Sequence, residues 1–92
     1  MIHGFRHKGL RVFFETGSTA RTPPALARQL RLQLAALHSA AQIEVLNLPG
    51  YRLHPLKGAD KGRRSIWVNG NWRLTYAFRD GHVFDLDFED YH

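Results

Sequence analysis

Three short segments of the chain carry the side chains that could do chemistry. They are HPLKG at 54–58, NWR at 71–73 and DYH at 90–92. Each also has an ordinary explanation, because a histidine in a strand often forms surface hydrogen bonds, an asparagine can finish a turn, and chain ends fray. Their combination is what suggests a function.

Together these residue types suit cleavage of RNA without a metal ion. The 2′-hydroxyl of RNA lies beside the scissile phosphate and can attack it. The reaction needs a base for that hydroxyl, an acid for the leaving 5′-oxygen, and cations for the charge that develops on phosphorus. Histidine suits the proton transfers, and arginine and lysine suit the phosphate. Aspartate can orient an imidazole or act as base, and tyrosine can stack on a base or carry a proton.

Other chemistries fit less well. The chain has no cysteine, which excludes disulfides, thiolate zinc sites and cysteine nucleophiles. Its six histidines include no HxH or HExxH pattern, so we expect no metal and no cofactor. The serines lie outside any nucleophile-elbow motif, and no glycine-rich phosphate loop occurs.

Length and charge narrow the choice further. A chain of 92 residues with 43% hydrophobic residues fits one folded domain, spanning 1–92. All 13 lysines and arginines lie in residues 1–79, which hold only three acidic residues. This basic body favours a polyanionic partner, nucleic acid above all, although a merely soluble basic surface is the simpler alternative. The start has no signal-peptide core and no apolar run could span a bilayer, so we expect a cytoplasmic protein without a membrane partner.

The N-terminal half is predicted to be mainly helical. Residues 2–6 read as a short first strand, and KGLRVFFET at 8–16 as a helix closed by Gly17. Thr22 followed by two prolines predicts a capped helix start. Leucines at helical spacing predict that this second helix runs from about 24 to 40, with an apolar stripe formed by Leu26, Leu30, Leu34 and Leu37.

The C-terminal half is predicted to be an antiparallel meander. A strand near 51–55 precedes two hairpins with turns at Asn69-Gly70 and Asp80-Gly81. Strand alternation places Trp72, Leu74, Tyr76, Phe78, Phe84, Leu86 and Phe88 inward, and Arg73, Thr75, Ala77, Asp85 and Asp87 outward. If Leu53 is inward, Arg52 and His54 are outward, so His54 and Arg73 share the open side of one sheet.

The chain resembles the HigB toxins, or plasmid maintenance killer proteins, of the RelE/ParE superfamily. The resemblance spans essentially the whole chain in order, through FRHKGL and FFETG, LNLPGYRLHPLKG, VNGNWRLTY and the ending FEDYH. It implies an α+β, RelE-like fold in which two N-terminal helices pack on a twisted, mostly antiparallel sheet of four to five strands.

The resemblance also implies site residues. The family's functional histidine and lysine fall on His54 and Lys57, its phosphate-binding arginine on Arg73, and its tail on Asp90, Tyr91 and His92. We assign proton transfer to Asp90 and His92, a second acid–base or phosphate-contacting role to His54, and stacking or orientation to Tyr91. Further RNA contacts are expected from Asn71, from Arg52, and from the unusually basic stretch that holds Lys61, Arg63 and Arg64.

The implied activity is a toxin's endonucleolytic cutting of mRNA in the ribosomal A site, with the 2′-hydroxyl as nucleophile. The implied partners are the ribosome with its rRNA, mRNA, and a HigA-like helix-turn-helix antitoxin, through which alone operator DNA is bound. Two alternatives stay open. One is a ParE-like toxin that inhibits a protein target such as DNA gyrase, and the other is a non-catalytic basic RNA-binding module.

Overall fold

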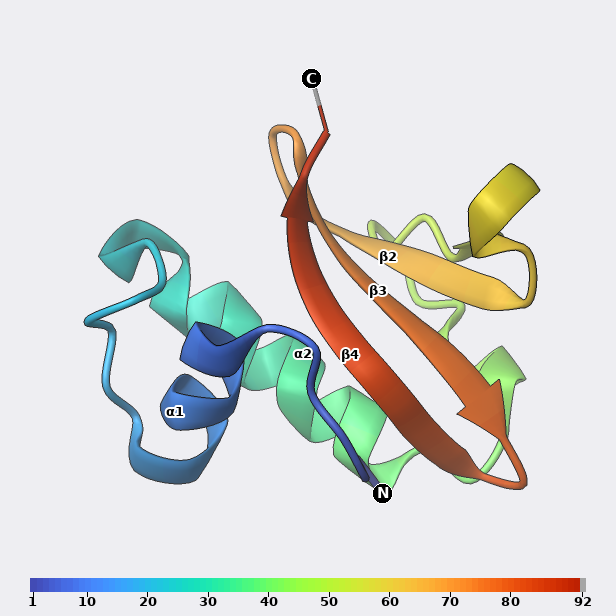
Figure 1. The fold of residues 1–92 in the computed structure, drawn as a ribbon, viewed down its shortest axis with the longest axis horizontal. Helices are drawn as coiled ribbons and strands as arrows, with labels where there is room; N and C mark the ends of the chain where they lie inside the picture. The colour runs from blue at the N-terminus through green and yellow to red at the C-terminus, as the bar shows by residue number, and fades with distance from the viewer. Residues whose placement is uncertain (92) are drawn as a thin grey trace.

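The computed structural model describes residues 1–91 and places two helices against one face of a four-stranded antiparallel sheet (Figure 1). The sheet order is β1-β2-β3-β4, so each strand pairs with the next along the chain. The helices are α1 (Lys8–Thr16) and α2 (Ala27–Ser39), and the strands are β1 (His54–Pro55), β2 (Arg63–Asn69), β3 (Trp72–Arg79) and β4 (His82–Asp90). Single 3₁₀ turns cover Pro24–Leu26, Ile43–Leu46 and Gly58–Asp60. The α+β class is confirmed.

Helix α1 is confirmed at its predicted bounds. Gly17 ends it in the left-handed conformation, with φ of 79°, and donates its N–H to the Phe13 carbonyl. The second helix is also confirmed, but its predicted threonine cap is wrong. Pro23 occupies the position before the 3₁₀ turn without a side-chain cap, and the buried Thr22 hydroxyl has no hydrogen-bond partner among residues 1–91.

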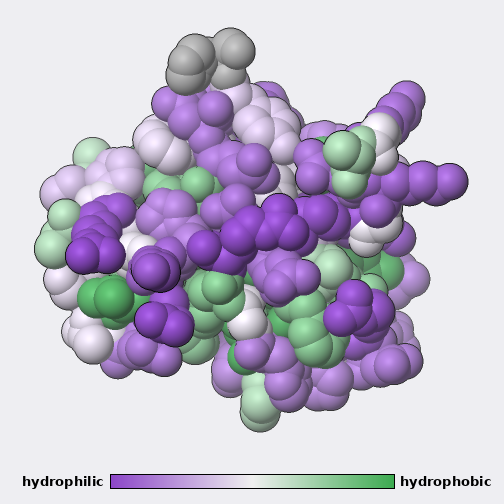
Figure 2. Space-filling view, in the orientation of Figure 1, coloured by the Kyte–Doolittle hydropathy of each residue, from purple (hydrophilic) through white to green (hydrophobic). Residues whose placement is uncertain are grey.

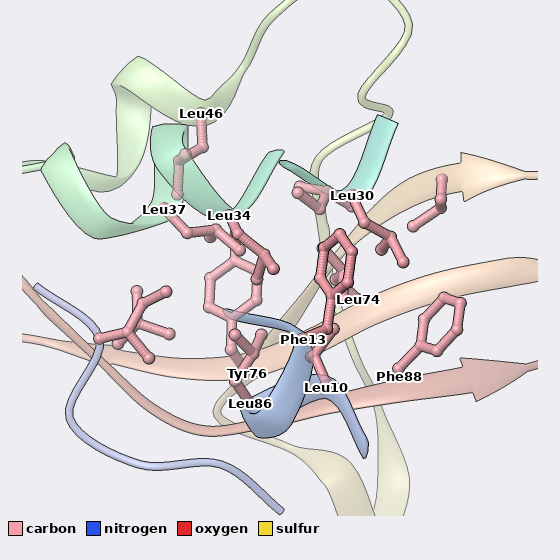
Figure 3. Packing of buried hydrophobic residues seen from close by; sticks show 14 of the residues in the cluster. Leu10, Phe13, Leu30, Leu34, Leu37, Leu46, Leu74, Tyr76, Leu86 and Phe88 are labelled. Atoms are coloured by element: carbon pink, nitrogen blue, oxygen red, sulfur yellow. The ribbon is translucent and has the colours of Figure 1, made fainter. Parts of the chain in front are cut away.

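The core fills the space between the helices and the sheet, as Figure 3 shows. Apolar side chains from each layer interlock there, and fully burying one stabilises the fold by about 1.5–3 kcal/mol. The helices contribute Leu10, Phe13, Leu30, Leu34 and Leu37, and the sheet contributes Ile66, Leu74, Tyr76, Leu86 and Phe88. Among residues 1–91, no helix combines the length and apolar character needed to cross a membrane.

Both hairpins form, but the first turn lies one residue later than predicted. Asn69 stands opposite Trp72, so the turn residues are Gly70 and Asn71, because a bulge between Trp67 and Asn69 shifts the register. The second turn is confirmed at Asp80-Gly81, where both residues adopt positive φ and Arg79 pairs with His82.

A second bulge corrects the inward prediction for Phe84. Ala77 stands opposite Phe84 and Thr75 opposite Asp87, which leaves an extra residue on β4 where Asp85 has φ of 51°. The alternation therefore reverses, and Val83 is buried instead of Phe84. The predicted strand at 2–6 is also not a full strand. Ile2 and Phe5 make only isolated parallel bridges to β4.

Candidate active site

The sheet face turned away from α1 and α2, called here the open face, gathers most of the polar residues of the strands. Directly opposed residues in antiparallel strands share a face, so the register defines its members. They are His54 on β1, Arg63, Ser65 and Trp67 on β2, Arg73 and Thr75 on β3, and Asp87 and Glu89 on β4. The predicted placement of His54 and Arg73 on one side of the sheet is confirmed.

His54 is exposed and held in one orientation at the β1 edge. Its Nδ1 lies 2.9 Å from the Arg52 carbonyl, and Ser65 Oγ lies 3.2 Å from its Nε2. Because a carbonyl oxygen only accepts hydrogen bonds, Nδ1 carries the hydrogen and Nε2 keeps its lone pair. The imidazole therefore has a nitrogen on the open face that can take a proton.

A buried polar chain crosses the middle of the open face. The Arg63 guanidinium donates from Nη2 to the Thr75 hydroxyl at 3.1 Å and to the Asp85 carbonyl at 2.9 Å. The Thr75 hydroxyl in turn donates to Glu89 Oε2 at 2.5 Å. Arg63 is only 8% exposed, so it serves this network rather than standing free for a phosphate.

Arg73 and Trp67 converge at the tip of the first hairpin. Arg73 Nη1 and the Trp67 indole N–H both donate to the Gly70 carbonyl, at 3.3 Å and 2.7 Å. The Arg52 guanidinium lies over the Trp67 ring, 4.3 Å from its centroid. Two arginines therefore flank one tryptophan at this end of the face.

Tyr91 reaches this region from the end of β4. Its N–H donates to the Asn71 carbonyl at 2.8 Å, which ties the end of the chain to the hairpin (Figure 1). Burial raises the pKa of the Tyr91 phenol, and the charges of Glu89 and Asp60 raise it further, against the opposing effect of Arg63 and Arg73. The phenol thus stays protonated and can donate a hydrogen bond or a proton.

The remaining predicted site residues are more scattered. Lys57 and Lys61 are exposed on either side of the Gly58–Asp60 turn, and Asn71 is exposed in the hairpin. Arg64 lies opposite Tyr76 and so faces the helix side of the sheet. Asp90 is exposed and lies opposite the inward Trp72 at the end of β4, so it too faces the helix side of the sheet. His92 lies outside the described residues.

Sequence analysis overlooked three open-face residues, Ser65, Trp67 and Glu89, and placed Thr75 on that side without giving it a role. The alternation that assigned Arg73 and Asp87 to the open side also assigns Glu89 to it, so a signal was present. Trp67 was harder to find, because aromatic residues in strands are more often buried.

Two hollows on the surface have volumes of about 290 and 370 Å³, and neither is lined by His54, Arg73 or Tyr91, although Trp67 lines the second. The first lies between α1 and α2, and the second between the start of α2 and the end of β2. The view in Figure 2 is dominated by hydrophilic side chains with small apolar patches between them. Within residues 1–91, no three His, Asp or Glu side chains come together in a way that could hold a metal ion.

Comparisons with known proteins agree with this architecture. Residues 3–92 match the family model described as the RelE-like toxin of type II toxin–antitoxin system HigB. The chain is 44% identical to "Endoribonuclease HigB" of Proteus vulgaris over 92 residues, which is the whole of both chains. Two crystal structures of YafQ from E. coli, one of them of a mutant, share the fold with a TM-score of 0.65 at 22% and 20% identity, covering 98% of this chain and 91% of theirs. A protein from Helicobacter pylori, HP0894, gives 0.54 at 17% identity, with 96% and 92% covered.

Proposed function

The chain belongs to the HigB-like family of RelE-like toxins from type II toxin–antitoxin systems, and from this we propose that it is a ribosome-dependent endoribonuclease that cuts mRNA in the A site. The endoribonuclease activity comes with the family and with the full-length relative that carries that name. The observation that supports the mechanism is the placement of His54, which is exposed on the same open face as Arg73 and is oriented by the Arg52 carbonyl and the Ser65 hydroxyl. We place this activity in the cytoplasm, where ribosomes are.

The proposed reaction is metal-free transesterification. The RNA 2′-oxygen bonds to phosphorus and loses its proton to a base, while the bond from phosphorus to the 5′-oxygen breaks and that oxygen takes a proton from an acid. A 2′,3′-cyclic phosphate and a 5′-hydroxyl result. His54 Nε2 and the tail residue His92 are the proposed proton-transfer groups, whereas Asp90, opposite the inward Trp72, faces the helix side of the sheet.

Charge stabilisation falls to Arg73 and Lys57. A guanidinium matches two phosphate oxygens at once, whereas Lys57 supplies a mobile point charge beside His54. Tyr91 keeps its proton because its pKa is raised, so it can donate to the phosphate or to the leaving oxygen.

The exposure of the proposed catalytic groups favours dependence on the ribosome. His54 and Tyr91 are exposed at the surface, and alignment of the reacting groups is a large part of such catalysis. A ribosome would supply the positioned codon. The cognate partner is a HigA-like helix-turn-helix antitoxin, and operator DNA would be reached only through that complex.

The test pairs two histidine variants with two substrates. His54→Ala and His92→Ala should each abolish growth arrest and slow mRNA cleavage on translating ribosomes by roughly 100-fold or more, while circular dichroism shows a native fold. His54→Asn retains a side-chain N–H near the Arg52 carbonyl but no titrating nitrogen, so it should be as inactive as His54→Ala.

Experiments with modified substrates test whether the 2′-hydroxyl is the nucleophile. An mRNA with a 2′-deoxy sugar at the cut site should resist cleavage, and wild-type protein should cut free RNA poorly until ribosomes are added. Undiminished growth arrest by both alanine variants would instead point to a ParE-like action on a protein target. Equal rates with and without ribosomes would remove the ribosome from the proposal.

A further inference from the structure

Arg52 is held in an unusual backbone conformation beside the proposed active site. Its φ is 51°, in the left-handed region that costs a non-glycine residue of order 1 kcal/mol or more. Two contacts hold it there: its carbonyl accepts from His54 Nδ1, and its guanidinium lies over Trp67. One residue therefore orients the imidazole with its backbone and covers an indole with its side chain.

The Trp67 ring is fixed in place. Its indole N–H donates to the Gly70 carbonyl at 2.7 Å, and its backbone N–H donates to the Tyr51 carbonyl at 2.6 Å. The ring is only half-buried on the open face, and the Arg52 side chain above it is exposed. Within residues 1–91, no hydrogen bond or ion pair engages that guanidinium, so its plane and its N–H groups remain available.

The pair also adjoins the phosphate-binding position. Trp67 stands directly opposite Arg73, and both donate to the same Gly70 carbonyl, so the indole edge and the Arg73 guanidinium lie next to each other. Unpaired RNA bases stack on aromatic rings and on arginine guanidinium planes, and the phosphate of the same nucleotide needs a cation nearby. Arg52, Trp67 and Arg73 supply these groups side by side.

We propose that Arg52 and Trp67 form a stacking platform for one unpaired base of the RNA substrate, next to the nucleotide whose phosphate Arg73 binds. The inference rests on the proposed nuclease function and assigns part of its RNA recognition. An RNA base suits this surface better than a protein side chain does, because the platform shares the open face with His54 and Arg73.

The first test measures the binding of RNA and does not require cleavage. In a Trp72→Phe protein, Trp67 is the only tryptophan, because the chain has two. A short single-stranded RNA with a 2′-deoxy sugar at the cut site should quench Trp67 fluorescence at low salt. The same RNA with one base removed at the stacking position should bind roughly tenfold or more weakly. Equal quenching by both RNAs, or quenching by the antitoxin but not by RNA, would overturn the platform.

The second test reads cleavage on translating ribosomes. Trp67→Leu should slow cutting by roughly 5- to 100-fold, whereas Trp67→Phe, which retains an aromatic face, should lose less than about threefold. Phe84→Leu is the matched control, because Arg79 covers the Phe84 ring at the same 4.3 Å on β4, three strands away from His54. The cleavage rate of this control variant should fall by less than about threefold.

The two tests separate the two proposals. If the wild-type protein cut no mRNA on ribosomes, the proposed nuclease function would be contradicted. Quenching of Trp67 fluorescence that depends on the base would still support the stacking platform. Two outcomes would contradict the stacking platform and leave the nuclease function standing. One is normal cutting by Trp67→Leu, and the other is a loss of cleavage rate that is as large on RNA lacking the stacked base.

Discussion

Arg63 differs from the other basic residues near the site in what its guanidinium contacts. It donates to Thr75 and to the Asp85 carbonyl in a nearly closed position, whereas Lys61, two residues earlier, is exposed. Removing a buried donor leaves its partners unsatisfied. We expect Arg63→Leu to lower the free energy of unfolding by about 2–3 kcal/mol, and Lys61→Ala to change it by less than about 0.5 kcal/mol.

Urea denaturation of the two variants measures this contrast directly. The Arg63 variant should unfold at a clearly lower urea concentration, with the slope of the transition unchanged. Similar midpoints for both variants would mean that Arg63 is as dispensable to the fold as a solvated lysine, which would return it to the set of free phosphate ligands.

The Tyr91 phenol gives a second prediction for a single residue. Burial and the negative charges of Glu89 and Asp60 raise its pKa, so its proton stays bound through the neutral range. Glu89→Gln removes one of those charges and should lower the pKa of Tyr91. Ultraviolet titration can follow this, with Tyr91→Phe versions of both proteins identifying the Tyr91 signal. An unchanged Tyr91 transition would place Glu89 too far from the phenol to matter.

Strand β3 carries a buried phenol hydroxyl, that of Tyr76, and its burial predicts how the stability of the fold depends on pH. Tyr76 is fully buried, its hydroxyl has no hydrogen-bond partner among residues 1–91, and burial raises its pKa against a smaller opposing effect of Arg64. A raised pKa in the folded state means that the unfolded chain ionises first, at about pH 10. The stability tied to the protonated phenol is therefore complete below that pH and declines above it.

Tyr76→Phe should remove this alkaline loss. At pH 7 the variant should be as stable as wild type or more stable by about 1 kcal/mol, because it lacks an unsatisfied buried hydroxyl. Above about pH 10 its advantage should grow by up to about 1.4 kcal/mol per pH unit. Tyr51 and Tyr91 are present in both proteins, so the difference between the two unfolding curves isolates Tyr76. If the difference in unfolding free energy between Tyr76→Phe and wild type stayed constant across this pH range, Tyr76 would not be the source of the alkaline loss of stability.

The same strands show how far the sequence alone could go. Periodicity and Gly17 predicted α1 to the residue, and alternation placed the inward residues of β3 correctly, because both signals are local. Phe84 was misplaced because a positive φ at Asp85, a residue without glycine's freedom, reversed the alternation of β4. The contact between Arg52 and Trp67 joins a loop to a strand, and no local pattern announces it.

At the scale of the whole molecule, charge is divided between the two edges of the sheet. Every acidic residue after Asp60 lies on β4 or the turn before it, and two of them, Asp87 and Glu89, lie on the open face. The cations Arg52, Lys57 and Lys61 lie in the segments just before and after β1, at the opposite edge. An RNA strand should therefore cross the β1–β2 side of the face, keep away from Asp87 and Glu89, and meet β4 only at its end, where Tyr91 follows.

This polarity predicts which charges govern the salt dependence of ribosome binding. Each lysine that neutralises a phosphate adds roughly one to the slope of log affinity against log salt concentration. Lys57→Ala and Lys61→Ala should each make that slope shallower by about one. Lys8→Ala removes the same charge from α1, on the covered side of the sheet, and should change the slope much less. Sedimentation with ribosomes over a salt series gives the three slopes. If the three substitutions make the salt slope shallower by the same amount, net charge alone drives ribosome binding. The open face would then have no special part in it.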